Sequence, residues 1–148
     1  GGSGYIAKLD EAQYEWLARE LSGTDKPVCI VSHEPILSAA AFLDGDNEET
    51  GEWKVPAAWM HIDLRLIKDL FKKHENVRLC LSGHLHLVDR VDYLGVTYIC
   101  DGAVSGAWWK GDYQECDEGY GIIDFYADGG FQHQYVSFGW RPVEEKEG

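Results

Sequence analysis

Three histidines in two short motifs have the residue types and the spacing to bind a metal ion. His33 follows the apolar run Val28–Val31, and His84 and His86 follow a second apolar run, Val77–Leu81. Each run predicts a short buried strand that ends just before its histidines. Because ligands bind outside the carboxyl ends of the strands in open α/β sheets, we expect the three imidazoles at one sheet edge. Neutral imidazole is a ligand for Zn, Mn and Fe, so this pattern indicates a metal-dependent hydrolase.

The residues around these histidines agree with a metal site. His84 and His86 are two residues apart, so they share a face on a strand, and in a tight loop they can reach two metal ions lying close together. Gly83 lets the backbone approach the site, and Pro35 stiffens the loop after His33. The other three histidines are interpreted as structural residues without partners: His61, His74 and His133.

Two helices and two hairpins complete the predicted elements. Asp10 and Gln13 have the spacing of a capping box, which predicts a helix that ends near Gly23. A broad apolar stripe predicts a second helix from about Pro56 to His74. Turn residues between alternating segments predict hairpins over 88–100 and 121–138. The expected fold class is therefore α/β.

Composition limits the classes of function. The chain has 148 residues, enough for one domain with a core. Its net charge is −13 and its 13 Lys and Arg residues are scattered, which argues against a nucleic-acid-binding surface and favours bound metal over a basic patch for an anionic substrate. No apolar stretch approaches the roughly 18 residues that span a bilayer, and the compartment stays open. Residues 1–4 are predicted to be a linker or loop, and residues 144–148 a flexible tail.

A glycine-rich loop over 101–111 ends in two tryptophans. Trp108 and Trp109 either form a wall of a substrate pocket or belong to the core, and we carry them forward as candidate substrate-binding residues. The loop lacks the lysine of a phosphate-binding P-loop.

The two histidine motifs resemble motif blocks of the calcineurin-like metallophosphoesterase superfamily. In chain order that family has D-x-H, G-D-x-x-D, G-N-H-[ED], a later histidine often followed by x-P, and G-H-x-H. The segment SHEP at 32–35 is similar to the fourth block, and GHLH at 83–86 is similar to the fifth. The helix before SHEP and the hairpin segment GVTYICDG after GHLH also resemble family members, so the resemblance covers nearly the whole chain.

The resemblance implies a phosphomonoesterase or phosphodiesterase with two metal ions, some pair of Fe, Mn or Zn. These ions would bind the phosphate of a small ester substrate and activate a water molecule for in-line attack at phosphorus. His33 and His84 would bind one ion and His86 the other. The implied fold is an α+β sandwich of two sheets packed face to face with flanking helices, of which this chain would be the C-terminal half.

The chain departs from the family because the first three blocks are absent from it. Those blocks supply the bridging aspartate, further ligands and a histidine that resembles a general acid. We therefore expect residues 1–148 to form a single partial domain that retains no catalytic residue, binds metal weakly or not at all, and is nearly inactive alone. The enzyme would be a protein longer at its N-terminus. The sheet that the missing half would cover is expected to self-associate.

Two other hypotheses stay open. One is a non-catalytic domain that binds a metal, a phosphate or a partner protein. The other is a hydrolase with one zinc ion on His33, His84 and His86, in which Glu34 is the base. Monoesters, diesters and cyclic nucleotides all remain candidate substrates.

Overall fold

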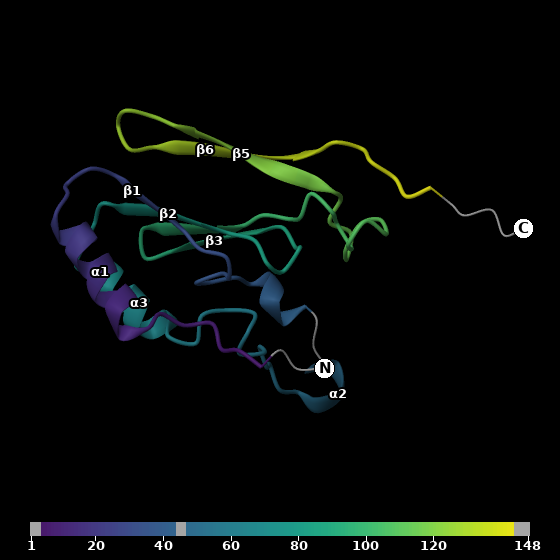
Figure 1. Cartoon of the computed structure of the whole chain (residues 1–148), viewed down its shortest axis with the longest axis horizontal. Helices are drawn as coiled ribbons and strands as arrows, with labels where there is room; N and C mark the ends of the chain where they lie inside the picture. The colour runs from purple at the N-terminus through teal and green to yellow at the C-terminus, as the bar shows by residue number, and fades with distance from the viewer. Residues whose placement is uncertain (1–3, 44–46, 144–148) are drawn as a thin grey trace, which may run out of the picture.

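The histidine motifs follow two neighbouring strands of a four-stranded sheet. The computed structural model describes residues 4–43 and 47–143, and its larger sheet has the order β1-β2-β4-β3. Strands β1, β2 and β4 are parallel and β3 is antiparallel to β4, so three carboxyl ends lie at one edge (Figure 1). The strand bounds are Val28–Val31 (β1), Val77–Ser82 (β2), Asp89–Tyr93 (β3) and Val96–Cys100 (β4).

A hairpin forms a second, two-stranded sheet. Strand β5 (Gly119–Phe125) pairs with β6 (Phe131–Ser137) from Gly119↔Ser137 to Phe125↔Phe131. This hairpin lies over one face of the larger sheet, and helices α1 (Glu11–Ser22) and α3 (Leu64–Phe71) cover the opposite face (Figure 1). The predicted α/β class is confirmed, with two sheets and a few helices.

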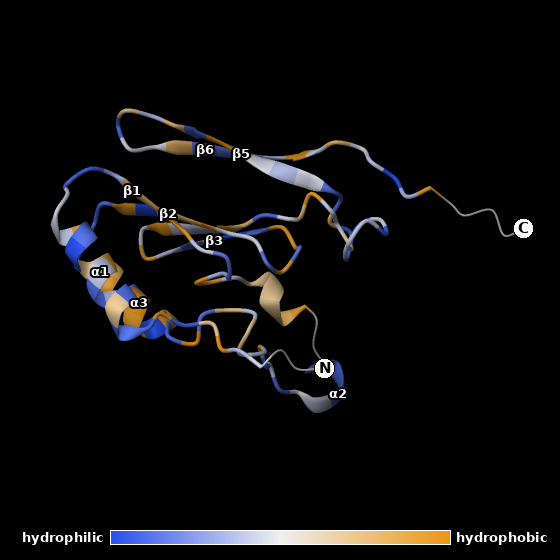
Figure 2. Ribbon diagram, in the orientation of Figure 1, coloured by the Kyte–Doolittle hydropathy of each residue, from blue (hydrophilic) through white to orange (hydrophobic). Residues whose placement is uncertain are grey.

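The main core lies between the helices and the four-stranded sheet. Strands β1 and β2 are largely apolar in Figure 2, as expected for parallel strands covered on both faces. Apolar side chains from one face of α1 and of α3 pack on this sheet and exclude water from it. The buried members include Leu17, Leu21, Ile67, Leu70, Phe71, Val77, Cys80 and Tyr98.

The first helix forms as its sequence predicts. The Asp10 carboxylate accepts a hydrogen bond from the Gln13 amide at 2.7 Å, and the Gln13 side chain accepts one from the Asp10 amide at 3.0 Å. These two bonds are the predicted capping box. The helix ends at Gly23, whose amide donates to the Arg19 carbonyl.

The second predicted helix is wrong over its first half, since α3 begins only at Leu64. The backbone of the preceding segment pairs with other parts of the chain. The amide of Ala7 donates to the carbonyl of Ala57, the amide of His61 to Pro35, and the amide of Ile62 to the carbonyl of Ala7. These bonds replace the hydrogen bonds that a helix would have made, so the apolar stripe there packs without helical geometry.

Two short elements that the structure describes connect β1 to α3. A 3₁₀ turn, η1 (Ala40–Phe42), and a helix of four residues, α2 (Asn47–Thr50), lie between β1 and α3. Most of the predicted linker, residues 1–3, and the whole predicted tail, 144–148, lie outside the described residues. Among the helices that the structure describes, none is both long and apolar enough to cross a membrane.

Candidate metal centre

His33 and His84 lie against each other at the carboxyl ends of β1 and β2. The pairing of these strands continues past their ends, because the Ser32 amide donates to Leu81 and the Gly83 amide donates to His33. This register holds Nε2 of His33 3.0 Å from Nδ1 of His84, with ring centroids 4.8 Å apart. Two imidazole nitrogens at this separation share one proton, and once that proton leaves, both lone pairs point to the same small region.

Glu34 and Tyr5 surround this pair. The ligand atoms of His33, Glu34 and His84 all lie within 4.8 Å of one another. The Tyr5 hydroxyl lies 3.4 Å from Nε2 of His84, where it can accept a hydrogen bond from a protonated Nε2 and leave the lone pair of Nδ1 for a metal. Sequence reasoning considered Glu34 only as a base, and it missed Tyr5 because a lone tyrosine 79 residues from its partner gives no local signal.

The environment favours the neutral form of His84. Partial burial lowers the pKa of this imidazole, the nearby His33 lowers it further, and the Glu34 carboxylate opposes the shift. A lowered pKa keeps His84 deprotonated to more acidic pH. Deprotonated imidazole is the form that binds metal ions, so the electrostatics and the geometry of the pair agree.

His86 is not a member of the His33–Glu34–His84 group, and it presents one nitrogen. Its Nδ1 is 2.6 Å from the carbonyl oxygen of Gly106. Because a carbonyl only accepts, Nδ1 carries the proton and Nε2 keeps its lone pair. A hydrogen bond from the other ring nitrogen to a carbonyl is the contact that usually orients a metal-binding histidine. Both His84 (φ 68°) and His86 (φ 60°) have left-handed backbone, which is uncommon for residues other than glycine and often marks a functional loop.

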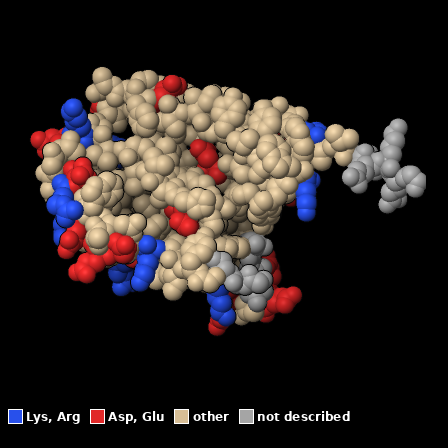
Figure 3. Space-filling view, viewed as in Figure 1, with Lys and Arg blue, Asp and Glu red and all other residues tan. Residues whose placement is uncertain are grey.

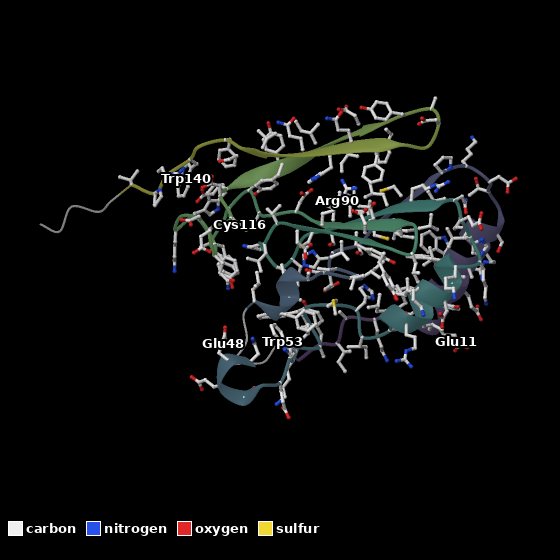
Figure 4. All side chains as sticks on the ribbon, turned by 180° about the vertical axis from the view of Figure 1, so that it is seen from behind. Glu11, Glu48, Trp53, Arg90, Cys116 and Trp140 are labelled. Atoms are coloured by element: carbon white, nitrogen blue, oxygen red, sulfur yellow. The ribbon has the colours of Figure 1, made fainter. Side chains whose placement is uncertain are left out.

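The two tryptophans of the glycine-rich loop point to different partners. The Trp108 ring stacks on the His86 ring, with centroids 4.5 Å apart and planes inclined by 32°. The Trp109 ring instead meets the edge of Trp140 at 5.4 Å. Figure 4 shows Trp140 and Cys116 at this end of the molecule. Of the two tryptophans, only Trp108 therefore contacts a predicted metal ligand.

Two histidines predicted to lack partners each have a carboxylate, so that part of the prediction is wrong. Nδ1 of His61 is 3.0 Å from Asp63, and Nε2 of His133 is 2.8 Å from Asp101. His133 lies on β6 and Asp101 follows β4, so their bond joins the two sheets. Sequence reasoning missed this pair, since it depends on how the hairpin packs on the larger sheet.

The outer edge of β1 is open next to His33. Strand β1 is a terminal strand of its sheet, and Val31 at its carboxyl end is 77% exposed. A cavity of about 340 Å³ lies beside it, lined by parts of α1, by the N-terminal segment and by both His33 and Glu34. Further polypeptide can therefore reach the histidine pair from this side.

Neither the charge distribution nor the comparisons with known proteins identify a family or a ligand for this chain. In Figure 3 the Lys and Arg side chains lie mainly at the helical side of the molecule, interspersed with Asp and Glu. No family model matches this sequence, and no curated protein matches it significantly.

Proposed function

We propose that this chain carries part of the active site of a metal-dependent phosphoester hydrolase of the calcineurin-like type. The observation that carries the proposal is the close approach of His33 Nε2 and His84 Nδ1, at 3.0 Å, beyond the carboxyl ends of adjacent parallel strands. The motifs that contain these residues, SHEP and GHLH, are those in which the sequence resembles that family. The proposal includes a more specific fold, in which the chain is the C-terminal half of the two-sheet sandwich.

The donor atoms suit the expected metals. His33 and His84 hold one ion between them, and Glu34 lies within reach of the same position. His86 offers Nε2 to a second ion, because Gly106 already occupies its Nδ1. Imidazole nitrogen with carboxylate oxygen is a ligand set for Zn, Mn or Fe. When bound, such ions supply Lewis-acid polarisation of the phosphate and a nucleophile at neutral pH.

The site needs ligands that these 148 residues do not contain. They include no D-x-H, no G-N-H and no G-D-x-x-D motif. The proposal therefore places the bridging carboxylate and the general acid on another segment of polypeptide, which reaches the site past the open edge of β1. The chain alone is expected to bind one ion weakly and to hydrolyse phosphate esters very slowly or not at all.

Zinc titration tests the ligand assignment. Isothermal titration calorimetry should detect Zn²⁺ binding by the chain, weakened more than about tenfold in His84→Ala. His74→Ala is the matched control, because His74 precedes β2 at the opposite end of that strand. Equal binding by all three proteins would contradict the assignment.

Complementation tests the reaction. The reading frame on the N-terminal side of this sequence should encode D-x-H, G-D-x-x-D and G-N-H, and co-expression of that polypeptide should produce Mn²⁺-dependent hydrolysis of p-nitrophenyl phosphate or its bis ester. The alternative, a non-catalytic binding domain, predicts metal binding without hydrolysis under any combination. A single tight zinc ion with esterase activity in the isolated chain would instead support the mononuclear hydrolase.

A further inference from the structure

Trp108 presents a large aromatic face beside the candidate metal centre. One face of its ring lies on His86, with centroids 4.5 Å apart. The side chain is nevertheless 62% exposed, so much of the ring remains open to solvent. Tyr113 meets both rings edge-on, at 5.7 Å from Trp108 and 6.2 Å from His86. The three rings form a corner in which the Trp108 ring keeps an open surface.

The backbone holds this ring in place at a cost in strain. Trp108 has φ 55° and Trp109 has φ 66°, a left-handed conformation that bulky residues rarely adopt. The loop is closed by hydrogen bonds from the Trp109 amide to Ser105 and from the Ala107 amide to Gly111. Strained backbone of this kind persists where the surroundings enforce it, and it is concentrated at ligand sites. The contacts of Trp108 with His86 and Tyr113 place its ring without a ligand, which lowers the ordering cost of binding.

We propose that Trp108 and Tyr113 form a stacking subsite for substrates that join a phosphate to a planar aromatic group, either a nucleoside or an aryl ester. The inference rests on the proposed function, because the phosphate is taken to bind at the metal centre next to it. His86 connects the two parts, because its Nε2 is left available for the proposed metal ion and its ring face lies against Trp108. A base or aryl ring bound to such a phosphate lies on the open face of Trp108.

Trp109 supplies an internal control. It has the same residue type, the same backbone conformation and a similar exposure of 53%. Its ring, however, meets Trp140 and no candidate metal ligand. A general effect of removing an exposed tryptophan from this loop would appear at both positions, whereas a stacking subsite depends on Trp108.

Paired ligands with and without an aromatic group test the proposal. Dissociation constants are measured by calorimetry, with and without Zn²⁺, for adenosine 5′-monophosphate and ribose 5-phosphate, and for phenyl phosphate and ethyl phosphate. The aromatic member of a pair should bind about tenfold more tightly. Trp108→Ala should reduce this ratio to about one, and Trp109→Ala should leave it unchanged. An advantage in both pairs indicates any aryl group, and an advantage in the first pair alone indicates a nucleoside.

Further outcomes separate this inference from the proposed function. If ribose 5-phosphate binds with Zn²⁺ but no aromatic ligand gains over its partner, the subsite is overturned and the phosphate site stands. If ribose 5-phosphate fails to bind while adenosine 5′-monophosphate binds and requires Trp108, the phosphate site fails and the subsite stands. If Trp108→Ala weakens the binding of both members of a pair equally, the subsite is overturned, and the role of Trp108 is instead to hold His86 in position. Trp108→Gly, which accepts positive φ without strain, is the second variant if alanine perturbs the circular dichroism spectrum.

Discussion

His33 and His84 face each other at the carboxyl edge of the sheet, whereas His133, between the two sheets, faces the carboxylate of Asp101. The His133–Asp101 pair joins a donor to a strong acceptor, and both side chains are mostly buried. The His33–His84 pair joins two groups of the same kind, which hydrogen-bond only while one nitrogen carries a proton and the other does not. We therefore interpret His133 as a structural residue between the sheets, and His33 and His84 as a pair that can exchange its shared proton for a cation.

Breaking the pair between the sheets should have the largest effect on stability. His133→Ala is expected to lower the free energy of unfolding by about 2 kcal/mol, less than for a fully buried pair because Asp101 retains some contact with water. Urea denaturation measures this loss, with His74→Ala as the control. Zinc binding should stay as in the unmodified chain, and a loss of stability below about 0.5 kcal/mol would remove the distinction between the two kinds of histidine.

Truncating the pair at the sheet edge should do the opposite. His33→Ala and His84→Ala are each expected to change the free energy of unfolding by less than about 0.5 kcal/mol in the presence of EDTA, because neither leaves a buried charge unpaired. Added Zn²⁺ should stabilise the unmodified chain and neither variant. Thermal unfolding with and without the metal provides both measurements, and a large loss in EDTA would show that these histidines are structural.

The exposed apolar end of β1 predicts self-association of the isolated chain. Val31 lies on an unpaired strand edge, where another chain can add a strand. Light scattering should detect a concentration-dependent increase in mass, and Val31→Lys should abolish it with little change in stability. The charged His74→Lys variant serves as a control at a distant surface. A strictly monomeric chain at all concentrations would contradict this expectation.

The smallest expected effect is on the pH dependence of stability. Burial and His33 lower the pKa of His84 in the folded state below the ordinary value of a histidine. As the pH falls below that value, the unfolded chain takes up a proton first, so the contribution of His84 to stability is lost. In EDTA, melting temperature should therefore fall less between pH 7 and pH 5 in His84→Ala than in the unmodified chain. An identical slope in both proteins would argue against the shift.

Local patterns predicted the elements whose causes are local. The capping box of Asp10 and Gln13 fixes the start of α1, because both of its hydrogen bonds join residues three apart. The apolar runs before His33 and His84 became parallel strands, as buried strands of this composition do. The helix predicted from Pro56 does not form before Leu64, because distant segments around Ala7 and Pro35 hydrogen-bond the backbone groups that the helix would have paired.

The candidate site likewise combines features that local sequence patterns predict with features that depend on the tertiary structure. The sequence alone determined which residue types follow which strands, and so delivered His33, His84 and His86 to the ends of apolar segments. Only the tertiary structure decided which nitrogens meet, because His33 and His84 are 51 residues apart and the pairing of β1 with β2 sets their distance. It also decided that Trp108 rests on His86 while Trp109 turns away, since that choice depends on the strained backbone of one loop.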